Sequence, residues 1–227
     1  MKSSKSKSIF HWFDGFLWRN PVLNVGLGVP FAVICSTTMK NAACVSIAMV
    51  FTCVAVFLLA SLAAKYIPQW LRMPVYALVA AAALIPAHAI AIKLNPALFD
   101  SLGIYFALMA MNPAVLIPAL SHRISNEKPW FALLHAVCFS LGFALVVFSI
   151  ALIREPMGSG MLWGRPIEVS LRLSPIQYPF GGFLLLGYFA ALYQLLERLF
   201  LQLGAYISKR KSARAAHKAN AEKASEQ

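Results

Sequence analysis

Four cysteines are the residues of this 227-residue chain best suited to redox or metal chemistry. They lie inside apolar runs, and no two of them have the C-x-x-C spacing: Cys35, Cys44, Cys53 and Cys138. Cysteines that form zinc sites or disulfide frameworks usually occur in recognisable, closely spaced sets. We therefore predict that these thiols are small buried hydrophobic side chains, with metal ligation as the alternative.

Two histidines, His88 and His135, fall inside long apolar stretches. An ionisable side chain at membrane depth is a hypothesis of function in itself. Each lacks an obvious carboxylate partner in its own stretch, so we predict a neutral imidazole hydrogen-bonded inside a helix bundle, with a proton or ion relay as the alternative. Asp100 and Glu127 lie at the ends of stretches, where solvated or helix-capping roles are expected.

The sequence contains no motif of a soluble enzyme: it has no Walker loop, no G-x-S-x-G and no H-E-x-x-H. A membrane enzyme with its active residues in the longest loop, 154–178, depends on five scattered charges: Arg154, Glu155, Arg165, Glu168 and Arg172. Such charges are usually solvated, so we expect no catalysis by the chain alone and predict no catalytic residue and no metal site.

The composition is that of a polytopic membrane protein. Hydrophobic residues make up 60% of the chain and charged residues 12%, whereas soluble domains carry about 25% charged residues. The mean hydropathy is +0.70. The net charge of +12 could suggest nucleic acid, but the basic residues lie at the chain ends and in short loops, which excludes that function for the chain as a whole.

The apolar runs predict six membrane spans, because a spanning helix needs about 20 apolar residues. They are 21–38, 42–64, 74–92, 98–120, 130–153 and 179–206. Residues 1–20 combine lysines with aromatic residues and are predicted to form a cytoplasmic interfacial segment. Residues 21–206 form the predicted membrane domain, and 207–227 a basic cytoplasmic tail.

The first and fourth spans contain residues that interrupt helices. Gly26, Gly28 and Pro30 lie in the first, and Asn112 and Pro113 in the fourth. Proline removes a helical hydrogen bond, and paired interruptions in corresponding positions indicate an inverted repeat with a site near the bilayer midplane. The predicted fold is therefore an all-α membrane protein of six transmembrane helices in an inverted repeat of three plus three, with broken first and fourth helices. Two ordinary proline kinks are the alternative.

The basic residues also predict the orientation. Fifteen of the twenty lysines and arginines lie on the side of both termini, and five on the other. Because cytoplasmic loops carry the excess of positive charge, we expect a multi-pass protein of the cytoplasmic (inner) membrane with both termini in the cytoplasm. The loop 154–178 would then lie outside.

Several ordered stretches resemble one membrane family, which comprises the E subunit of the Rnf electron transport complex and the D subunit of the sodium-translocating NADH:quinone reductase. The resemblance covers roughly residues 18 to 200. The stretches are Lys65-Tyr66-Ile67-Pro68, Arg72-Met73-Pro74-Val75, Ser101-Leu102-Gly103-Ile104 leading to Asn112, Leu141-Gly142-Phe143, Arg154-Glu155 and Gly158-x-Gly160.

The resemblance implies a six-helix membrane protein with an inverted repeat and cytoplasmic ends. It also implies pairing with a sister protein of opposite orientation, which is the A subunit in the Rnf complex. Between the two the family holds a [2Fe–2S] cluster, with two cysteines from each partner, one in each broken helix. Electrons pass through it while the complex moves sodium or protons.

The sequence departs from this family at both cluster positions. The first family cysteine directly precedes a proline, where this chain has Val29 before Pro30. The second follows an asparagine, where this chain has Pro113 after Asn112. Because iron–sulfur clusters are held mainly by cysteine thiolates, we expect no cluster built in the family's way and no cofactor in this chain.

Another cysteine is a possible replacement ligand. Cys35 is six residues beyond Val29, which is about 9 Å along a helix and too far for a simple substitution. Cys138, in the fifth span, could approach only if the packing differs from that of the family.

Two functions follow. The first is an integral membrane subunit of an Rnf-like ion-translocating electron transport complex, in contact with lipid and other subunits, whose cluster is lost or relocated. The second is a non-redox protein, either a small transporter or a structural subunit, on the same fold, since fold does not determine function.

Overall fold

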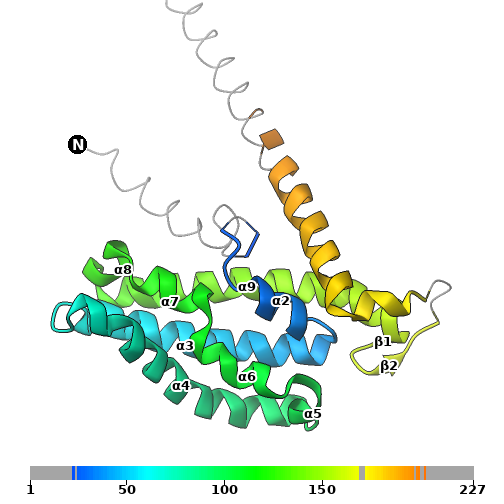
Figure 1. Cartoon of the computed structure of the whole chain (residues 1–227), viewed down its shortest axis with the longest axis horizontal. Helices are drawn as coiled ribbons and strands as arrows, with labels where there is room; N and C mark the ends of the chain where they lie inside the picture. Colours follow the sequence, from blue (N-terminus) through cyan, green and yellow to red (C-terminus); the bar gives the residue numbers. More distant parts are fainter. Residues whose placement is uncertain (1–21, 24, 169–171, 197, 200–201, 203–227) are drawn as a thin grey trace, which may run out of the picture. The chain divides into compact units, whose positions relative to one another are not determined.

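A computed structural model of the protein shows a mostly helical chain (Figure 1). It describes residues 22–23, 25–168, 172–196, 198–199 and 202. Within these residues, four helices are long and apolar enough to cross a membrane: α3 (Met39–Ala63), α4 (Gln69–Leu94), α9 (Pro129–Ser159) and the helix Pro179–Leu196. The predicted membrane protein is therefore confirmed, whereas the predicted segments 1–20 and 207–227 lie outside the described residues.

The chain divides into two compact units, Met1–Gly187 and Tyr188–Gln227. The first contains every residue argued about below. In the second, the described residues continue the last long helix, and the ring centroids of Tyr188 and Phe189 lie 6.5 Å apart.

Helix α3 is the centre of the first unit. It packs mainly against α4 and α9, and Figure 1 shows it between them. In the most apolar 18-residue stretch of each helix, 61% is buried for α3, 33% for α4 and 44% for α9. Several of the fully buried residues of α3, α4 and α9 are alanines, among them Ala48, Ala60, Ala80 and Ala136. Small side chains let membrane helices approach closely, which favours association where lipid offers no hydrophobic driving force.

The first and fourth predicted spans are short pieces separated by irregular backbone. The first contains α2 (Val29–Cys35). The fourth is divided into α5 (Leu98–Leu102), α6 (Ile104–Leu108), a 3-10 turn (Met109–Met111) and α7 (Pro113–Ala119), followed by α8 (His122–Asn126). Gly103, with φ of 51°, separates α5 from α6. The fourth span is thus more fragmented than the sequence predicts, because a single glycine in an apolar run does not by itself mark an interruption.

Helix α9 is longer than the predicted span 130–153. It continues through Arg154 and Glu155 to Ser159 and ends at Gly160, which has the left-handed φ of 68° that favours glycine. A short hairpin of β1 (Met161–Leu162) and β2 (Arg165–Pro166) follows, and then a 3-10 turn (Ser174–Gln177). The predicted start of the loop at residue 154 is therefore wrong.

A polar cluster ties the start of α3 to the end of α4. The Asn95 side-chain amide donates to Asn41 Oδ1 at 2.8 Å, and the Ser101 hydroxyl donates to the same oxygen at 3.0 Å. The Asn41 side chain in turn donates to Thr37 Oγ1 at 3.3 Å. These bonds satisfy the buried amides and hold α5 beside α3.

Candidate functional site

The two helix interruptions meet inside the protein. Gly28 precedes α2 with φ of 73°, and a Cβ added there would lie 2.9 Å from Asn112 Oδ1 and 3.0 Å from the Ala114 Cβ. Asn112 precedes α7 and is fully buried. Residues 84 positions apart in the chain are thus in direct contact, and only a glycine fits at the first of them.

Both polar atoms of the Asn112 side chain, Oδ1 and Nδ2, have partners at this junction. Its Oδ1 accepts a hydrogen bond from the Ala114 backbone N–H at 3.0 Å and so caps α7. Its Nδ2 faces two fully buried thioethers, Met109 Sδ at 3.6 Å and Met49 Sδ at 3.8 Å. The carboxamide therefore satisfies the start of α7 and also contacts the central helix α3.

The residues around the junction range from buried to exposed. Gly28 is buried, Val29 and Pro113 are half-buried, and Gly26 and Pro30 are exposed. Val29 begins α2 and Pro113 begins α7. The two positions predicted to correspond to the family's cysteines are therefore the first residues of two short helices, and both side chains are half-buried.

The donor set at these two positions does not fit an iron–sulfur cluster. An isopropyl group and a pyrrolidine ring offer no atom that ligates iron. All four cysteines are free thiols; Cys35, Cys44 and Cys53 are buried, which confirms the prediction for these three, and Cys138 is half-buried. The Cys44 thiol donates to the Ala91 carbonyl at 3.5 Å.

Arg154 is a second centre of the site, and it is completely buried. Its guanidinium donates to the Val33 carbonyl and to Ser36 Oγ at the end of α2. It also donates to three carbonyls that follow the hairpin, those of Ile176, Gln177 and Tyr178, at 3.0, 2.7 and 3.2 Å. A positive charge at a helix C-terminus is favourable, so Arg154 caps α2 and fastens the loop to it.

Glu155, only 2% exposed, performs the complementary task. Its Oε2 accepts a hydrogen bond from the Met39 N–H at 2.7 Å, at the first residue of α3, and its Oε1 accepts one from the Gly164 N–H at 3.1 Å, in the hairpin. A negative charge at a helix N-terminus is stabilised by the unpaired N–H groups there. Two adjacent residues of α9 thus cap the end of one helix and the beginning of the next.

The predicted solvation of Arg154 and Glu155 is therefore wrong. The prediction places them in an outside loop, because charged residues usually end an apolar stretch. No local pattern marks this continuation, because Pro156 and Gly158, residue types that usually interrupt helices, also lie inside α9. The helix continues there because the backbone groups of α2, α3 and the loop compensate both charges.

Two glycines let the last long helix approach the residues around Arg154 closely. A Cβ at Gly182, in the last long helix, would lie 2.7 Å from the Val33 side chain and 2.9 Å from Arg154 Nη1. A Cβ at Gly181 would lie 2.6 Å from the Ile176 backbone. This helix therefore packs onto the Arg154 guanidinium at positions where only glycine fits.

The structure changes the predicted roles of His135 and Glu127 and leaves Asp100 exposed, as predicted. His135 Nε2 lies 3.4 Å from Glu127 Oε2, and both side chains are mostly buried. The sequence predicts no carboxylate partner for His135 and a solvated or capping role for Glu127, because eight residues and a helix start separate them. His88 lies in α4 against the ring of Phe106, and Asp100 is exposed in α5.

Comparison with known proteins gives a family and several relatives. The model of the Rnf-Nqr family, described as a membrane protein subunit, matches residues 9–197. A protein of Shewanella oneidensis, named as the E subunit of an ion-translocating oxidoreductase complex, is 25% identical over 198 residues, covering 80% of this chain and 85% of that protein. A protein of the same name from Aliivibrio fischeri is 27% identical, covering 80% and 87%.

The contact at Gly28 predicts different outcomes for two matched substitutions. Gly26 and Gly28 have nearly equal φ values of 72° and 73°, so alanine costs about 1–2 kcal/mol of backbone strain at either position. A Cβ meets nothing within 4 Å at Gly26 but Asn112 at Gly28. We expect Gly28→Ala to lower the free energy of unfolding in detergent by about 1–3 kcal/mol more than Gly26→Ala. Equal losses in the two variants would contradict the contact.

The burial of Arg154 predicts a large loss on its removal. Arg154→Met leaves several backbone carbonyls without donors. Each buried polar group left unsatisfied costs about 1–3 kcal/mol. Arg154→Lys, which keeps the charge without the planar fork, should fall between this variant and the wild type in thermal unfolding. Arg165→Met, at an exposed position of β2, is the control, and a similar loss in Arg154→Met and this control would refute the capping role.

Proposed function

The chain belongs to the Rnf-Nqr family of membrane protein subunits, and on that premise we propose that it is an integral membrane subunit of an Rnf-like ion-translocating oxidoreductase complex. The relatives that carry this description align with most of the chain and with most of their own length. The observation that carries the proposal is the contact between the two helix interruptions, Gly28 and Asn112. It places two irregular segments together within a bundle of membrane-length helices.

We further propose an inverted repeat of three plus three spans. Helices α2 and α7 are both seven residues long, both begin directly after an interruption and both have a proline in the first turn. The next long helix after α2 is α3, and the next long helix after α7, beyond the short α8, is α9; α3 and α9 pack against each other. The similar order of elements in the two halves supports six spans, of which the first and fourth are broken.

The partner proposed for the broken spans is the inverted six-helix sister protein, the A subunit of an Rnf-like complex. Exposed apolar residues lie near both interruptions along the chain: Val25 is 58% exposed, Met111 65% and Ile117 46%. Pro30 is also exposed. A surface on which irregular backbone is accessible at membrane depth is tolerated when another protein covers it, which is the reason to place the sister protein here.

The charge distribution supports the cytoplasmic (inner) membrane with both termini in the cytoplasm. The caps of α2 and α3 by Arg154 and Glu155, and the hairpin, would then lie at the outer side. The two positions that ligate the family's cluster carry Val29 and Pro113, so in this chain the junction would support the subunit interface and contribute no iron ligand.

A non-redox role is the second candidate. The missing thiolates at Val29 and Pro113 favour it, since the fold could serve a small transporter or a structural subunit equally well. Solute uptake by the purified chain alone in proteoliposomes is the observation that would support it.

The primary test is affinity purification of the tagged chain from mildly solubilised native membranes, with identification of its partners by mass spectrometry. We expect recovery of an inverted six-helix protein together with flavin-bearing and iron–sulfur-bearing subunits. Another tagged membrane protein of similar size, from the same membranes, controls for nonspecific recovery. Isolation of the chain alone would overturn the assignment.

The absence of cluster ligands predicts that no cysteine of this chain holds iron. Cys35→Ala, Cys44→Ala, Cys53→Ala and Cys138→Ala should each leave the iron content and the electron paramagnetic resonance spectrum of the purified complex unchanged. The reason is that three of these thiols are buried in helix contacts. A loss of iron in one variant would identify a shifted ligand and disprove the prediction.

A further inference from the structure

An apolar groove follows the hairpin, and the proposed function has not used it. It lies between the 3-10 turn after the hairpin and the start of the last long helix. All of its lining residues are apolar, and they include Leu173, Ile176, Phe180, Gly181 and Leu184. The groove has a volume of about 220 Å³. Pockets for compact small molecules usually measure about 300–1,000 Å³, so this groove suits a narrower apolar chain.

The length of α9 places the groove near the lipid headgroups. Helix α9 has 31 residues, which is about 46 Å, whereas the hydrocarbon core of a bilayer is about 30 Å thick. Its ends therefore reach the headgroup layers, and the Leu173 N–H at the groove donates to the Met157 carbonyl near one of these ends at 2.8 Å. Trp163 in the hairpin is 45% exposed and Tyr178 after the turn 68%. Such aromatic residues are enriched where a membrane meets water.

Three basic side chains gather at the hairpin. A Cβ added at Gly160 would lie 2.9 Å from Arg172 Nη2, and a Cβ added at Gly164 would lie 3.0 Å from Lys40 Nζ. The third basic residue, Arg165, is exposed in β2 itself. The start of α3, the hairpin and the turn thus bring positive charge to one place from three parts of the chain.

The residues around these basic side chains do not neutralise them. Within the part of the chain that the structure describes, none of the three takes part in an ion pair. Residues 156–178 contain a single carboxylate, that of Glu168. Arg172 is exposed and directly precedes Leu173 in the chain, so a positive charge lies next to the apolar lining of the groove.

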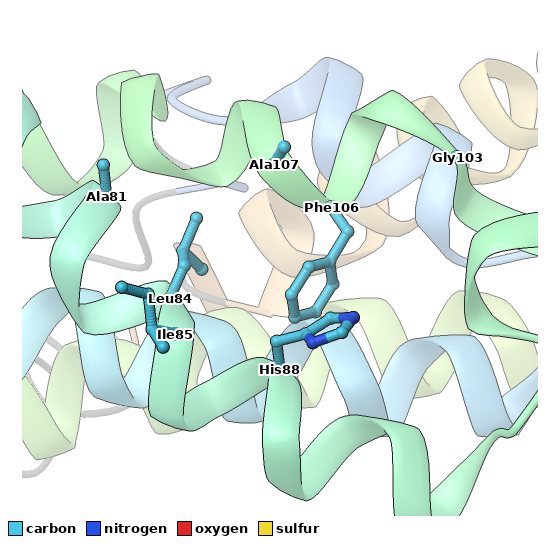
Figure 2. A pocket seen from close by; sticks show the side chains of 7 residues that line it. All are labelled: Ala81, Leu84, Ile85, His88, Gly103, Phe106 and Ala107. Atoms are coloured by element: carbon cyan, nitrogen blue, oxygen red, sulfur yellow. The ribbon is translucent and has the colours of Figure 1, made fainter.

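A second groove, between α4 and α6, differs in charge and serves as a comparison. Leu84 and Ile85 of α4 line it, and Figure 2 shows the His88 ring facing the Phe106 ring there. The centroids of these two rings are 5.7 Å apart. The lining of this second groove contains no lysine and no arginine, so it offers no reason to prefer an anionic molecule to a neutral one.

We propose that the groove beside the hairpin binds an acyl chain of an anionic phospholipid, whose phosphate-bearing headgroup contacts Arg172. The guanidinium group binds phosphate through two parallel hydrogen bonds, and basic pockets beside transmembrane helices bind the headgroups of acidic lipids. A phospholipid joins an anion to an apolar chain at the depth where this protein has a cation beside an apolar groove. The proposal goes beyond the proposed function, because it requires no other subunit.

The test uses photoactivatable lipids with the full chain in lipid nanodiscs. Phosphatidylglycerol, which is anionic, and phosphatidylcholine, which has no net charge, carry the same diazirine-labelled acyl chain at the same mole fraction. Mass spectrometry locates the labelled peptides after irradiation. We expect phosphatidylglycerol to label residues 173–185 about fivefold more than phosphatidylcholine, which corresponds to about 1 kcal/mol for one basic residue at an anionic membrane surface. Both lipids should label residues 81–88, at the second groove, equally.

Two substitutions of basic residues separate a direct contact from general attraction to positive charge. Arg172→Gln should lower the labelling of residues 173–185 by phosphatidylglycerol to the level of phosphatidylcholine. Lys93→Gln is the matched control, because Lys93 is exposed near the end of α4 and does not line the groove. The end of α4 lies beside the start of α3, where Asn95 donates to Asn41. Lys93→Gln should leave the labelling unchanged.

Two phenylalanines of the last long helix test the apolar part of the site. Phe180 lines the groove and is 73% exposed, whereas Phe183 is 50% exposed and does not line it. Phe180→Ala should lower the labelling of the groove by both lipids, because it removes part of the apolar wall. Phe183→Ala should lower neither, and the labelling of residues 81–88 is the internal control for folding in all four variants.

Several results would overturn the proposal. Equal labelling of residues 173–185 by the two lipids would show only the lipid that surrounds any membrane protein. Equal effects of Arg172→Gln and Lys93→Gln would show attraction to charge without a site. Loss of the preference in inorganic phosphate, but not in sodium chloride of the same ionic strength, would identify a site for a free anion. Absence of labelling in the complex from native membranes would show that a protein covers the groove.

Discussion

The arrangement of this protein depends on one constraint: a helix that ends inside a membrane must find polar partners within the protein, because lipid supplies none. Helix α2 ends inside the protein, where the buried Arg154 donates to the Val33 carbonyl and to the Ser36 hydroxyl. Helix α3 begins nearby, and Glu155 accepts from its first N–H. Helix α7 begins at the junction, and Asn112 Oδ1 accepts from the N–H of its second residue, Ala114. At the other end of α3, Arg72 donates to the carbonyls of Ala64 and Ile67.

These caps do more than satisfy individual groups, because two of them come from neighbouring residues. Arg154 and Glu155 differ by one position on α9, yet they bind the end of α2, the start of α3, the hairpin and the 3-10 turn that follows it. A displacement of the loop would therefore also displace α2, whose start adjoins the junction with Asn112.

The junction packs without any side chain at its helix starts that could ligate iron. Gly28 and Asn112 are in contact, and the short helices α2 and α7 begin at Val29 and Pro113. Both residues suit helix starts, since β-branched and proline side chains are tolerated there and proline is favoured in a first turn, but neither can bind iron. The packing of the two interruptions therefore does not depend on a bound cluster, and the proposed subunit interface depends only on that packing.

The sequence by itself determined the membrane class, the positions of the long helices and the interruption at Asn112 and Pro113, because hydropathy and proline act locally along the chain. Only the tertiary structure decided that Gly28 touches Asn112, that His135 lies beside Glu127 and that Arg154 and Glu155 are buried. A membrane helix such as α3 is apolar around its whole circumference, so its sequence carries no amphipathic pattern that marks the buried face. The partners of a polar group are then set by which helix ends the packing brings near it, and those ends are distant in the chain.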